Sequence, residues 1–473
     1  MLGPVISRAA VSREQLPAYL LIYLLGQLVR GGDDTADEFL MESIHYSLTL
    51  TGHVTQRRKV LISAYACEPG RGSEPGVGWH MCQAISREHD AWIITRKNNR
   101  QQIEAALIQQ ANPHLHFCYA DLPGWMRVWK RGGRGIRLYY YLWQFAALYE
   151  SIRLMRSVKF DLAHHITFVN DFMFTFLAFL PIPFVWGPIG SVSKRPASLS
   201  DGKISLLRER AEFYFKAFLR SADPLFWLSA IRAKLVIGIN SEIGRRFPLS
   251  VLVQSKYTSY PAIGVEQVIA APHLSAAQKG LRILSSGRLV PLKAFHLTVQ
   301  AFAALCRREP TATLTIVGDG RLQQSLERLA TRLDVRERVN FVRWLPRSEA
   351  LNLMRQADVF LFPSFEAAGM VVLEAMAHGL PVVCLQRSGP ADLITKECGF
   401  AVPIGPMKNT VEKLANALEA LARDRALRVK MGAAATRVIQ DKYLWEDRHK
   451  TIMHWYLAAD FGMTVLPERR CGA

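Results

Sequence analysis

Two glutamates, Glu366 and Glu374, stand eight positions apart in the largely apolar stretch "SFEAAGMVVLEAMAHGLPVV". The preceding "DVFLFPS" has the pattern of a buried strand, and "MVVLEAMAH" that of a helix closed by a glycine. Amides at the start of such a helix are free to bind an anion, here those of Gly369, Met370 and Val371. Because carboxylates accept hydrogen bonds from hydroxyls, the stretch predicts a site for an anion next to hydroxyl groups.

A second group of charges lies upstream, in "SSGRLVPLKAF". Arg288 and Lys293 follow an expected strand, and ligands of open α/β sheets bind beyond the carboxyl ends of the strands. Two cations beside Gly287 suit a diphosphate. An ordinary solvated loop would explain these residues equally well if they stood alone, and the acidic stretch downstream favours the ligand.

The secondary structure that would position these residues can be predicted from the sequence. Strand and helix patterns alternate over two long regions of the chain. The first region contains strands such as "KVLISA", "AWIITR", "FDLAHHIT", "IPFVWGP" and "AKLVIGINS", and the second contains "LRILSS", "ATLTIVGDG", "RVNFVRW", "DVFLFPS" and "LPVVCL". This alternation predicts an α/β fold with two doubly wound parallel sheets. The expected segments are an N-terminal extension at 1–57, a domain at 58–265, a linker at 266–279, a domain at 280–440, a C-terminal helix at 441–460 that packs back on the first domain, and a tail at 461–473.

Composition narrows the class of protein without choosing a function. The chain has 473 residues, which is long enough for two or three domains. Its formal net charge of +19 suits nucleic acid, anionic lipid or phosphorylated small molecules. Seven cysteines, none in a C-x-x-C pair, argue against a disulfide framework or a zinc site and favour a reducing compartment.

Two apolar stretches have the composition of membrane-spanning segments. Leu16–Val29 is shorter than the roughly 20 residues that cross a bilayer, and a plain amphipathic helix is expected there. Phe172–Gly190 is long enough, but its three prolines would break a spanning helix. We predict a buried helix, a turn and a short strand in this stretch, and no transmembrane segment.

A basic and aromatic segment runs from Trp125 to Trp143. Its cations Arg127, Lys130, Arg131, Arg134 and Arg137 interleave with Trp125, Trp129 and a run of tyrosines. Such a mixture suits an anionic membrane surface or single-stranded nucleic acid, although no nucleic-acid motif accompanies it. A solvated loop followed by a core helix is an equally good interpretation.

Four blocks in order, "GRLVPLK", "LTIVGDG", "VNFVRWLP" and "EAAGMVVLEAMAHGLPVV", resemble the donor domain of retaining glycosyltransferases of family 4, which have the GT-B fold. The resemblance covers about residues 58–460. It implies two Rossmann-like domains that face each other across a cleft, with a nucleotide-sugar bound mainly by the second domain.

The resemblance also implies roles for individual residues. Arg288 and Lys293 would hold the diphosphate, Glu374 would bind the ribose, and Glu366 would lie near the hydroxyls of the donor sugar. The turn from Ala368 to Val371 would offer backbone N–H groups, and residues near Gly318 and Arg343 would border the base. The family often has Gly-Phe-Gly where this chain has Ala367-Ala368-Gly369, and often glycine in place of Arg343, so the donor's identity stays open.

The acceptor side is less well marked. In the resembled family the loop at residues 70–78 approaches the donor phosphate and the acceptor, which Gly72, Ser73 and Gly76 could contact. A tight turn without a ligand is an even alternative, and a dinucleotide site is disfavoured because the next strand ends in Thr95-Arg96 rather than in an acid. His165, of the strand-end pair "HH", is the candidate on the acceptor side, against a purely structural role.

The predicted activity is transfer of a sugar from a nucleotide-sugar to a hydroxyl of a glycan or lipid-linked acceptor, with retained configuration. No D-x-D pair is present, so we expect neither a metal nor a cofactor beyond the nucleotide-sugar. We expect a cytoplasmic protein that does not bind nucleic acid, and contact with the inner face of an anionic membrane stays open. The alternatives are a nucleotide-sugar epimerase of the same fold and a non-catalytic protein that binds nucleotide-sugars.

Overall fold

The computed structural model describes residues 57–128, 135–191, 195–199, 203–247, 253–261, 263–269, 280–387 and 389–461. The helix expected at Leu16–Val29 lies outside these residues, as do nearly all of the expected extension and most of the tail. Within the described ranges, no helix is both long and apolar enough to cross a bilayer.

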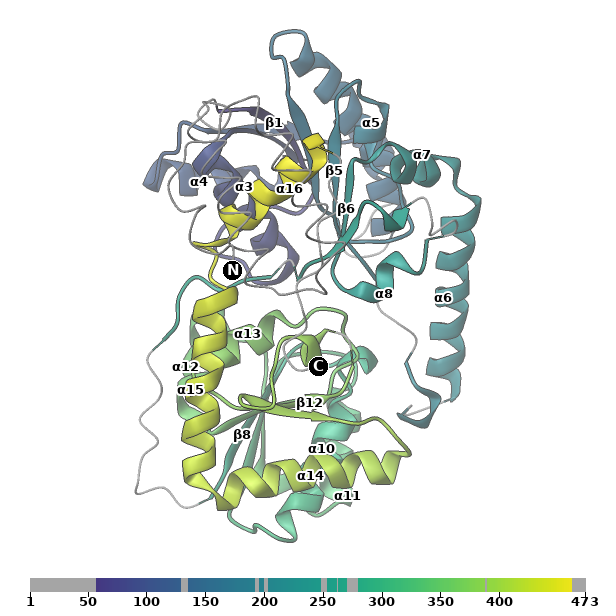
Figure 1. The fold of residues 1–473 in the computed structure, drawn as a ribbon. Coiled ribbons are helices and arrows are strands. Elements are labelled where there is room, and N and C mark those ends of the chain that lie inside the picture. Colours follow the sequence, from purple (N-terminus) through teal and green to yellow (C-terminus); the bar gives the residue numbers. More distant parts are fainter. Residues whose placement is uncertain are drawn as a thin grey trace, which may run out of the picture. The chain divides into compact units, whose positions relative to one another are not determined.

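The first region is built on a sheet of seven parallel strands in the order β3-β2-β1-β4-β5-β6-β7. Figure 1 labels β1, β5 and β6 of this sheet. These strands are β1 (Lys59–Ala64), β2 (Asp90–Arg96), β3 (Leu115–Ala120), β4 (Leu162–Thr167), β5 (Phe184–Ile189), β6 (Leu235–Gly238) and β7 (Tyr257–Ser259). The central strands β4, β5 and β6 are buried along their whole length, as expected of parallel strands covered on both faces.

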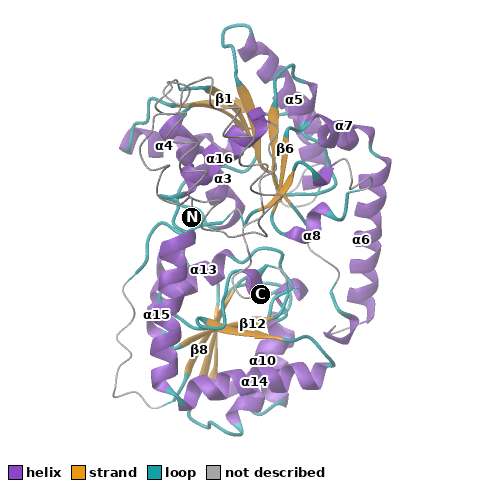
Figure 2. Cartoon of the chain, viewed as in Figure 1, coloured by secondary structure: helices purple, strands orange, loops and turns teal. Residues whose placement is uncertain are grey.

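Helices connect these strands, and Figure 2 shows the strands lying between them. The helices are α3 (Ser73–Glu88), α4 (Arg100–Gln109), α5 (Ile136–Met155), α6 (Lys203–Ala222), α7 (Pro224–Arg232) and α8 (Ser241–Gly244). Short 3-10 turns are η1 (Lys97–Asn99), η2 (Gly124–Arg127), η3 (Phe176–Phe179) and η4 (Ala197–Leu199).

The second region has a sheet of six parallel strands in the order β10-β9-β8-β11-β12-β13. The strands are β8 (Arg282–Ser286), β9 (Thr313–Val317), β10 (Val339–Val342), β11 (Val359–Phe362), β12 (Val382–Leu385) and β13 (Gly399–Val402). The helices are α10 (Phe295–Cys306), α11 (Gln323–Arg332), α12 (Arg347–Gln356), α13 (Met370–Ala377), α14 (Met407–Arg423) and α15 (Arg425–Lys442), with 3-10 turns η5 (Pro291–Lys293), η6 (Arg336–Arg338) and η7 (Pro390–Asp392). The predicted pair of doubly wound parallel sheets is confirmed.

The last described helix, α16 (Arg448–Phe461), lies against the first region although it follows the second in sequence. In Figure 1 it is the yellow helix beside α3. The hydroxyl of Tyr456 is 3.0 Å from Nδ1 of His164 on β4, and the ring of Trp455 meets that of Tyr260 edge to face at 4.9 Å. The end of the described chain therefore contributes to the core of the first region.

Two predicted elements differ from the structure. The loop expected at residues 70–78 is partly helical, because α3 begins at Ser73. A Cβ at Gly76 would stand 2.0 Å from the carbonyl oxygen of Arg71, so glycine allows α3 to pack closely under the loop. The buried helix expected after Phe172 is only the 3-10 turn Phe176–Phe179, whereas the strand that follows is confirmed as β5.

Candidate functional site

A pocket of about 1310 Å³ lies where loops after the strands of both sheets come together. This position agrees with the rule that ligands of open α/β sheets bind beyond the carboxyl ends of the strands. The residues predicted from the sequence that line it are Gly72, Ser73, Gly287, Arg288, Lys293, Glu366, Ala368, Gly369, Met370, Val371 and Glu374. Most of the predicted site is therefore gathered in one cavity.

Lys293 and Glu366, which both line the pocket, form an ion pair between two loops of the second region. Nζ of Lys293 lies 2.6 Å from Oε2 of Glu366 and 4.7 Å from the centre of the Phe362 ring. Gly287 has φ of 146°, and a Cβ there would stand 3.0 Å from Cε of Lys293. The positive φ thus favours glycine, and the absence of a Cβ leaves room for the lysine side chain. Arg288, exposed beside this pair, has no ion-pair partner among the described residues and adds an uncompensated positive charge.

The start of α13 supplies backbone N–H groups to the same pocket. Gly369 caps the helix, and its carbonyl accepts from the N–H of Val372 at 2.8 Å. Within the described part of the chain, no carbonyl or side chain accepts a hydrogen bond from the N–H groups of Gly369, Met370 or Val371. This agrees with the prediction of a helix N-terminus open to an anion. Sδ of Met370 lies 3.2 Å from the backbone nitrogen of Ser73, which joins this loop to the loop after β1.

Glu374 is held by an arginine that the sequence did not single out. Nε of Arg347 lies 3.0 Å from Oε1 of Glu374, and a second guanidinium nitrogen lies 3.8 Å from Oε1 of Glu266. Glu266 also lies 3.3 Å from Nε2 of His80 on α3. Burial raises the pKa of Glu374, and the charge of Arg347 opposes this shift. In the sequence, only the position of Arg347 shortly after the strand β10, in "RWLPRSEA", indicates that it could reach a ligand site.

Glu74 is a second pocket residue that was not predicted. It lies in the first turn of α3, and its Oε1 accepts a hydrogen bond from the backbone N–H of Val169. Burial raises the pKa of Glu74 to about 7, while the bond from Val169 and the charge of Arg96 oppose the shift. From sequence, Glu74 falls in the loop predicted at residues 70–78, whereas the structure places it in the first turn of α3.

Two cations border the first-region side of the pocket. Arg137 on α5 and Lys216 on α6 contact Glu212 at 2.5 Å and 2.9 Å. Both also lie over the ring of Phe172, at 5.7 Å and 5.4 Å from its centre. Arg137 belongs to the basic and aromatic segment noted in the sequence, of which residues 129–134 lie outside the described residues.

Four predicted residues do not line the pocket. His165 is 1% exposed in β4, and burial lowers its pKa to about 4. Gly76 lies within α3, and a Cβ at Gly318 would stand 2.1 Å from the carbonyl oxygen of Gly287. Arg343 has an 80% exposed side chain and pairs with Asp319 at 3.4 Å. The structure thus places His165 inside the sheet rather than at the pocket surface. The two glycines lie where the backbone packs too closely for a Cβ.

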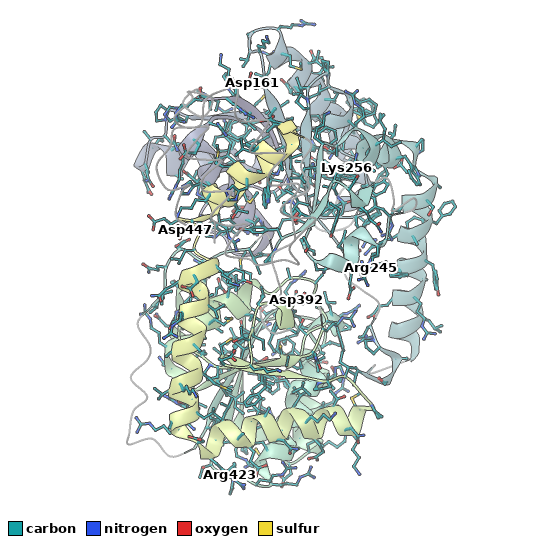
Figure 3. The ribbon with its side chains drawn as sticks, in the orientation of Figure 1. Asp161, Arg245, Lys256, Asp392, Arg423 and Asp447 are labelled. Atoms are coloured by element: carbon teal, nitrogen blue, oxygen red, sulfur yellow. The ribbon has the colours of Figure 1, made fainter. Side chains whose placement is uncertain are left out.

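A further loop closes the pocket beside α13. Asp392, labelled in Figure 3, accepts a hydrogen bond from the N–H of Gly389 at 3.0 Å. Gly389 has φ of 104°, and a Cβ there would stand 2.4 Å from the carbonyl oxygen of Glu366. Glycine therefore lets the backbone of this loop pack closely against the turn that carries Glu366.

The family described as Glycosyl transferases group 1 matches residues 271–438. Among curated proteins, the chain is 33% identical over 172 residues to a GDP-mannose-dependent monoacylated alpha-(1-6)-phosphatidylinositol monomannoside mannosyltransferase of Corynebacterium glutamicum, covering 35% of this chain and 44% of that protein. It is 34% identical over 173 residues to the lipopolysaccharide core biosynthesis glycosyltransferase LpsE of Rhizobium meliloti, covering 34% and 48%. The chain spans about half the length of these curated relatives.

Solved structures match over most of the chain. Sucrose-phosphate synthase from Thermosynechococcus elongatus has a TM-score of 0.60 at 16% identity, covering 86% of this chain and 100% of that one. HepE of Anabaena in complex with UDP and glucose has a TM-score of 0.57 at 18% identity, covering 85% and 100%. The fold is GT-B, and residues 271–438 match the family of group 1 glycosyltransferases.

Proposed function

We propose that the protein is a retaining glycosyltransferase that moves a sugar from a nucleotide-sugar to an acceptor hydroxyl. The observation that carries this proposal is the convergence of Arg288, the Lys293–Glu366 pair and the start of α13 on one pocket. Cations and free amides suit a diphosphate, and the adjacent carboxylates suit the hydroxyls of a sugar and a ribose.

In this proposal Arg288 and Lys293 bind the diphosphate, and Glu366 binds hydroxyls of the donor sugar. Glu374 binds the ribose, with Arg347 orienting its carboxylate through the 3.0 Å contact. The base lies at the edge of the pocket that Gly287 and Trp344 line, toward Gly318 and Arg343, which lie just outside the lining. HepE, which shares the fold, was solved with UDP and with UDP-glucose, which supports a nucleotide-sugar as the donor.

The chemistry follows from the charge that develops on the leaving diphosphate. Arg288, Lys293 and the amides at the start of α13 are in place before the reaction, so they stabilise that charge without rearranging. We assign this role to them without a divalent ion. Attack on the same face as the departing diphosphate retains the configuration, and a phosphate oxygen of the leaving group accepts the acceptor's proton. No protein nucleophile is assigned.

The acceptor is proposed to be a glycan or lipid-linked precursor of a cell-surface polysaccharide or glycolipid. Two matched relatives bear names that concern lipopolysaccharide core and a phosphatidylinositol mannoside. On this chain, α5 and α6 each expose a stripe of apolar side chains at helical spacing, comprising Leu138, Phe145, Tyr149 and Ile152, and Leu207, Tyr214 and Phe218. Exposed basic side chains on α5 include Arg137 and Arg153. We propose that these stripes contact the cytoplasmic face of an anionic membrane.

Co-sedimentation with phosphatidylglycerol vesicles tests the membrane contact. We expect binding to these vesicles at low salt, weaker binding to phosphatidylcholine vesicles, and release at high salt. Tyr214→Ser combined with Phe218→Ser should reduce binding severalfold, whereas Val429→Ser, at an exposed apolar position on α15, should not. Equal binding by both variants would contradict the proposed surface.

A thermal-shift panel of nucleotide-sugars tests the donor assignment. One nucleotide-sugar should raise Tm, because a ligand that binds only the folded state stabilises it. Arg288→Ala should abolish that rise, since the exposed guanidinium has no structural partner to lose among the described residues. No rise with any donor, or normal turnover by Arg288→Ala, would contradict the proposed function.

A further inference from the structure

Glu74 is a carboxyl of the pocket that the donor-binding roles leave unused. Its Oε1 is fixed by the backbone N–H of Val169, and the residue lines the pocket. Among the described residues, none donates a hydrogen bond to its second oxygen, Oε2. One oxygen is therefore anchored to the scaffold, and the other is left for a ligand.

We propose that Glu74 binds the attacking hydroxyl of the acceptor through Oε2. The proposal rests on the transferase function above, and it adds a residue on the acceptor side of the pocket. Glu74 belongs to α3 of the first region, whereas Arg288, Lys293 and Glu366 belong to the second. A hydroxyl held by Glu74 would thus approach the donor sugar from the opposite wall of the pocket. As the hydroxyl attacks, its proton leaves the hydrogen bond to Oε2 and passes to an oxygen of the departing phosphate.

The chemistry of a carboxylate favours a hydroxyl over an anion at this place. Glu74 is fixed by a backbone amide rather than by a cation, so no ion pair within the described ranges neutralises its negative charge. A phosphate placed against Oε2 would be repelled, whereas a hydroxyl would donate a hydrogen bond to it. Hydrogen bonds to charged groups are stronger than neutral ones, and anchoring at Val169 limits the entropy lost when the hydroxyl is oriented.

The groups around Glu74 predict how this binding depends on pH. Burial raises its pKa to about 7, while the charge of Arg96 on β2 lowers it in part. Tyr65, just after β1, and Tyr140 on α5 also face it, and burial raises the pKa of both phenols, so they stay neutral near pH 7. Glu74 therefore becomes a charged acceptor as pH rises through about 7, and the reaction should speed up over that range.

Hydrolysis of the donor found by the thermal-shift panel tests the proposal, because water then serves as the acceptor. Glycerol is added in parallel as a second nucleophile. Glu74→Gln keeps an oxygen for Val169 but presents an amide N–H₂ in place of Oε2. We expect hydrolysis and glycerol transfer to fall about tenfold to hundredfold, with the donor Kd unchanged and the rise near pH 7 lost. Glu88→Gln, at the exposed far end of α3, is the matched control and should behave as wild type.

Each other outcome is decisive. Equal rates and equal pH profiles for wild type and Glu74→Gln would overturn the proposal, and a deficit seen only in Glu74→Ala would reduce Glu74 to an anchor for Val169. A loss of donor affinity that accounts for the whole loss of rate would place Glu74 against the donor and also overturn it. If no donor binds, or if bound donor is not consumed by wild type, the transferase function itself fails.

Discussion

The two sides of the pocket hold their charged groups in different ways. On the second-region side, both glutamates face a cation, in the pairs Lys293–Glu366 at 2.6 Å and Arg347–Glu374 at 3.0 Å. On the first-region side, Glu74 is fixed by a backbone amide. Paired charges can bind phosphates and hydroxyls of one ligand together, whereas a carboxylate without a paired cation selects hydroxyl donors. The difference indicates two ligands of unlike chemistry, one for each side.

Removing a cation of the second-region side should give the largest effect. Lys293→Ala removes one stabilising charge and also leaves Glu366 without its partner beside the diphosphate. We expect kcat/KM to fall by about 10²–10³, the loss typical of one preorganised donor of charge stabilisation. Steady-state kinetics with the identified donor measures this, with Lys396→Ala at an exposed position of the same region as control. A loss of less than about threefold would show that the pair is structural.

Glu374 should govern the donor's affinity more than the rate. Glu374→Gln weakens hydrogen bonds from the ribose, and we expect Kd to rise about tenfold to hundredfold with kcat little changed. Because burial raises the pKa of Glu374, wild-type affinity should decline as pH falls through a value above the ordinary glutamate range. Calorimetric titration at several pH values should show this decline in wild type and not in Glu374→Gln. The same pH dependence in both proteins would exclude Glu374 as its source.

Arg347 should have a smaller effect, through Glu374. Arg347→Ala removes the cation that opposes the raised pKa of Glu374, so the carboxyl should stay protonated to a higher pH. We expect Kd for the donor to rise about threefold to tenfold at pH 7 and its pH dependence to shift upward. Arg355→Ala, farther along α12, is the matched control. A change in affinity without the upward shift would mean that Arg347 contacts the donor directly.

The second-region side could be predicted from sequence because its signals are local. Glu366, Gly369 and Glu374 lie on one strand–turn–helix corner, and Gly287, Arg288 and Lys293 lie on another. Each corner follows a short buried strand, so the rule that ligands bind beyond strand ends was enough to place these residues. Most of the strands were predicted for the same reason, with β1 matching its expected bounds of Lys59–Ala64.

The other functional residues depend on contacts between distant segments. Arg347 meets Glu374 across 27 positions, and Val169 reaches Glu74 across 95. His165 was placed wrongly at the pocket surface for a related reason. In a strand buried on both faces, a polar residue type does not show which way its side chain points. Only the folded structure therefore reveals that the side chain of His165 is buried within the sheet. The first turns of α3 were not predicted because glycine has a low helix propensity. At position 76 glycine is favoured instead by the close approach of the Arg71 carbonyl.

The smallest expected change in donor affinity follows from removing two cations on the first-region side of the pocket. Arg137 and Lys216 lie over Phe172 and share Glu212, on the side assigned to the acceptor. If the donor occupies the second-region side, Arg137→Gln combined with Lys216→Gln should leave its Kd within about twofold of wild type, because surface charges outside a contact act weakly through solvent. Calorimetry with the identified donor measures this, and Lys293→Ala in the same series shows the size of a true donor contact. A tenfold loss in the double variant would mean that the donor extends across the pocket, and that the two sides bind one ligand rather than two.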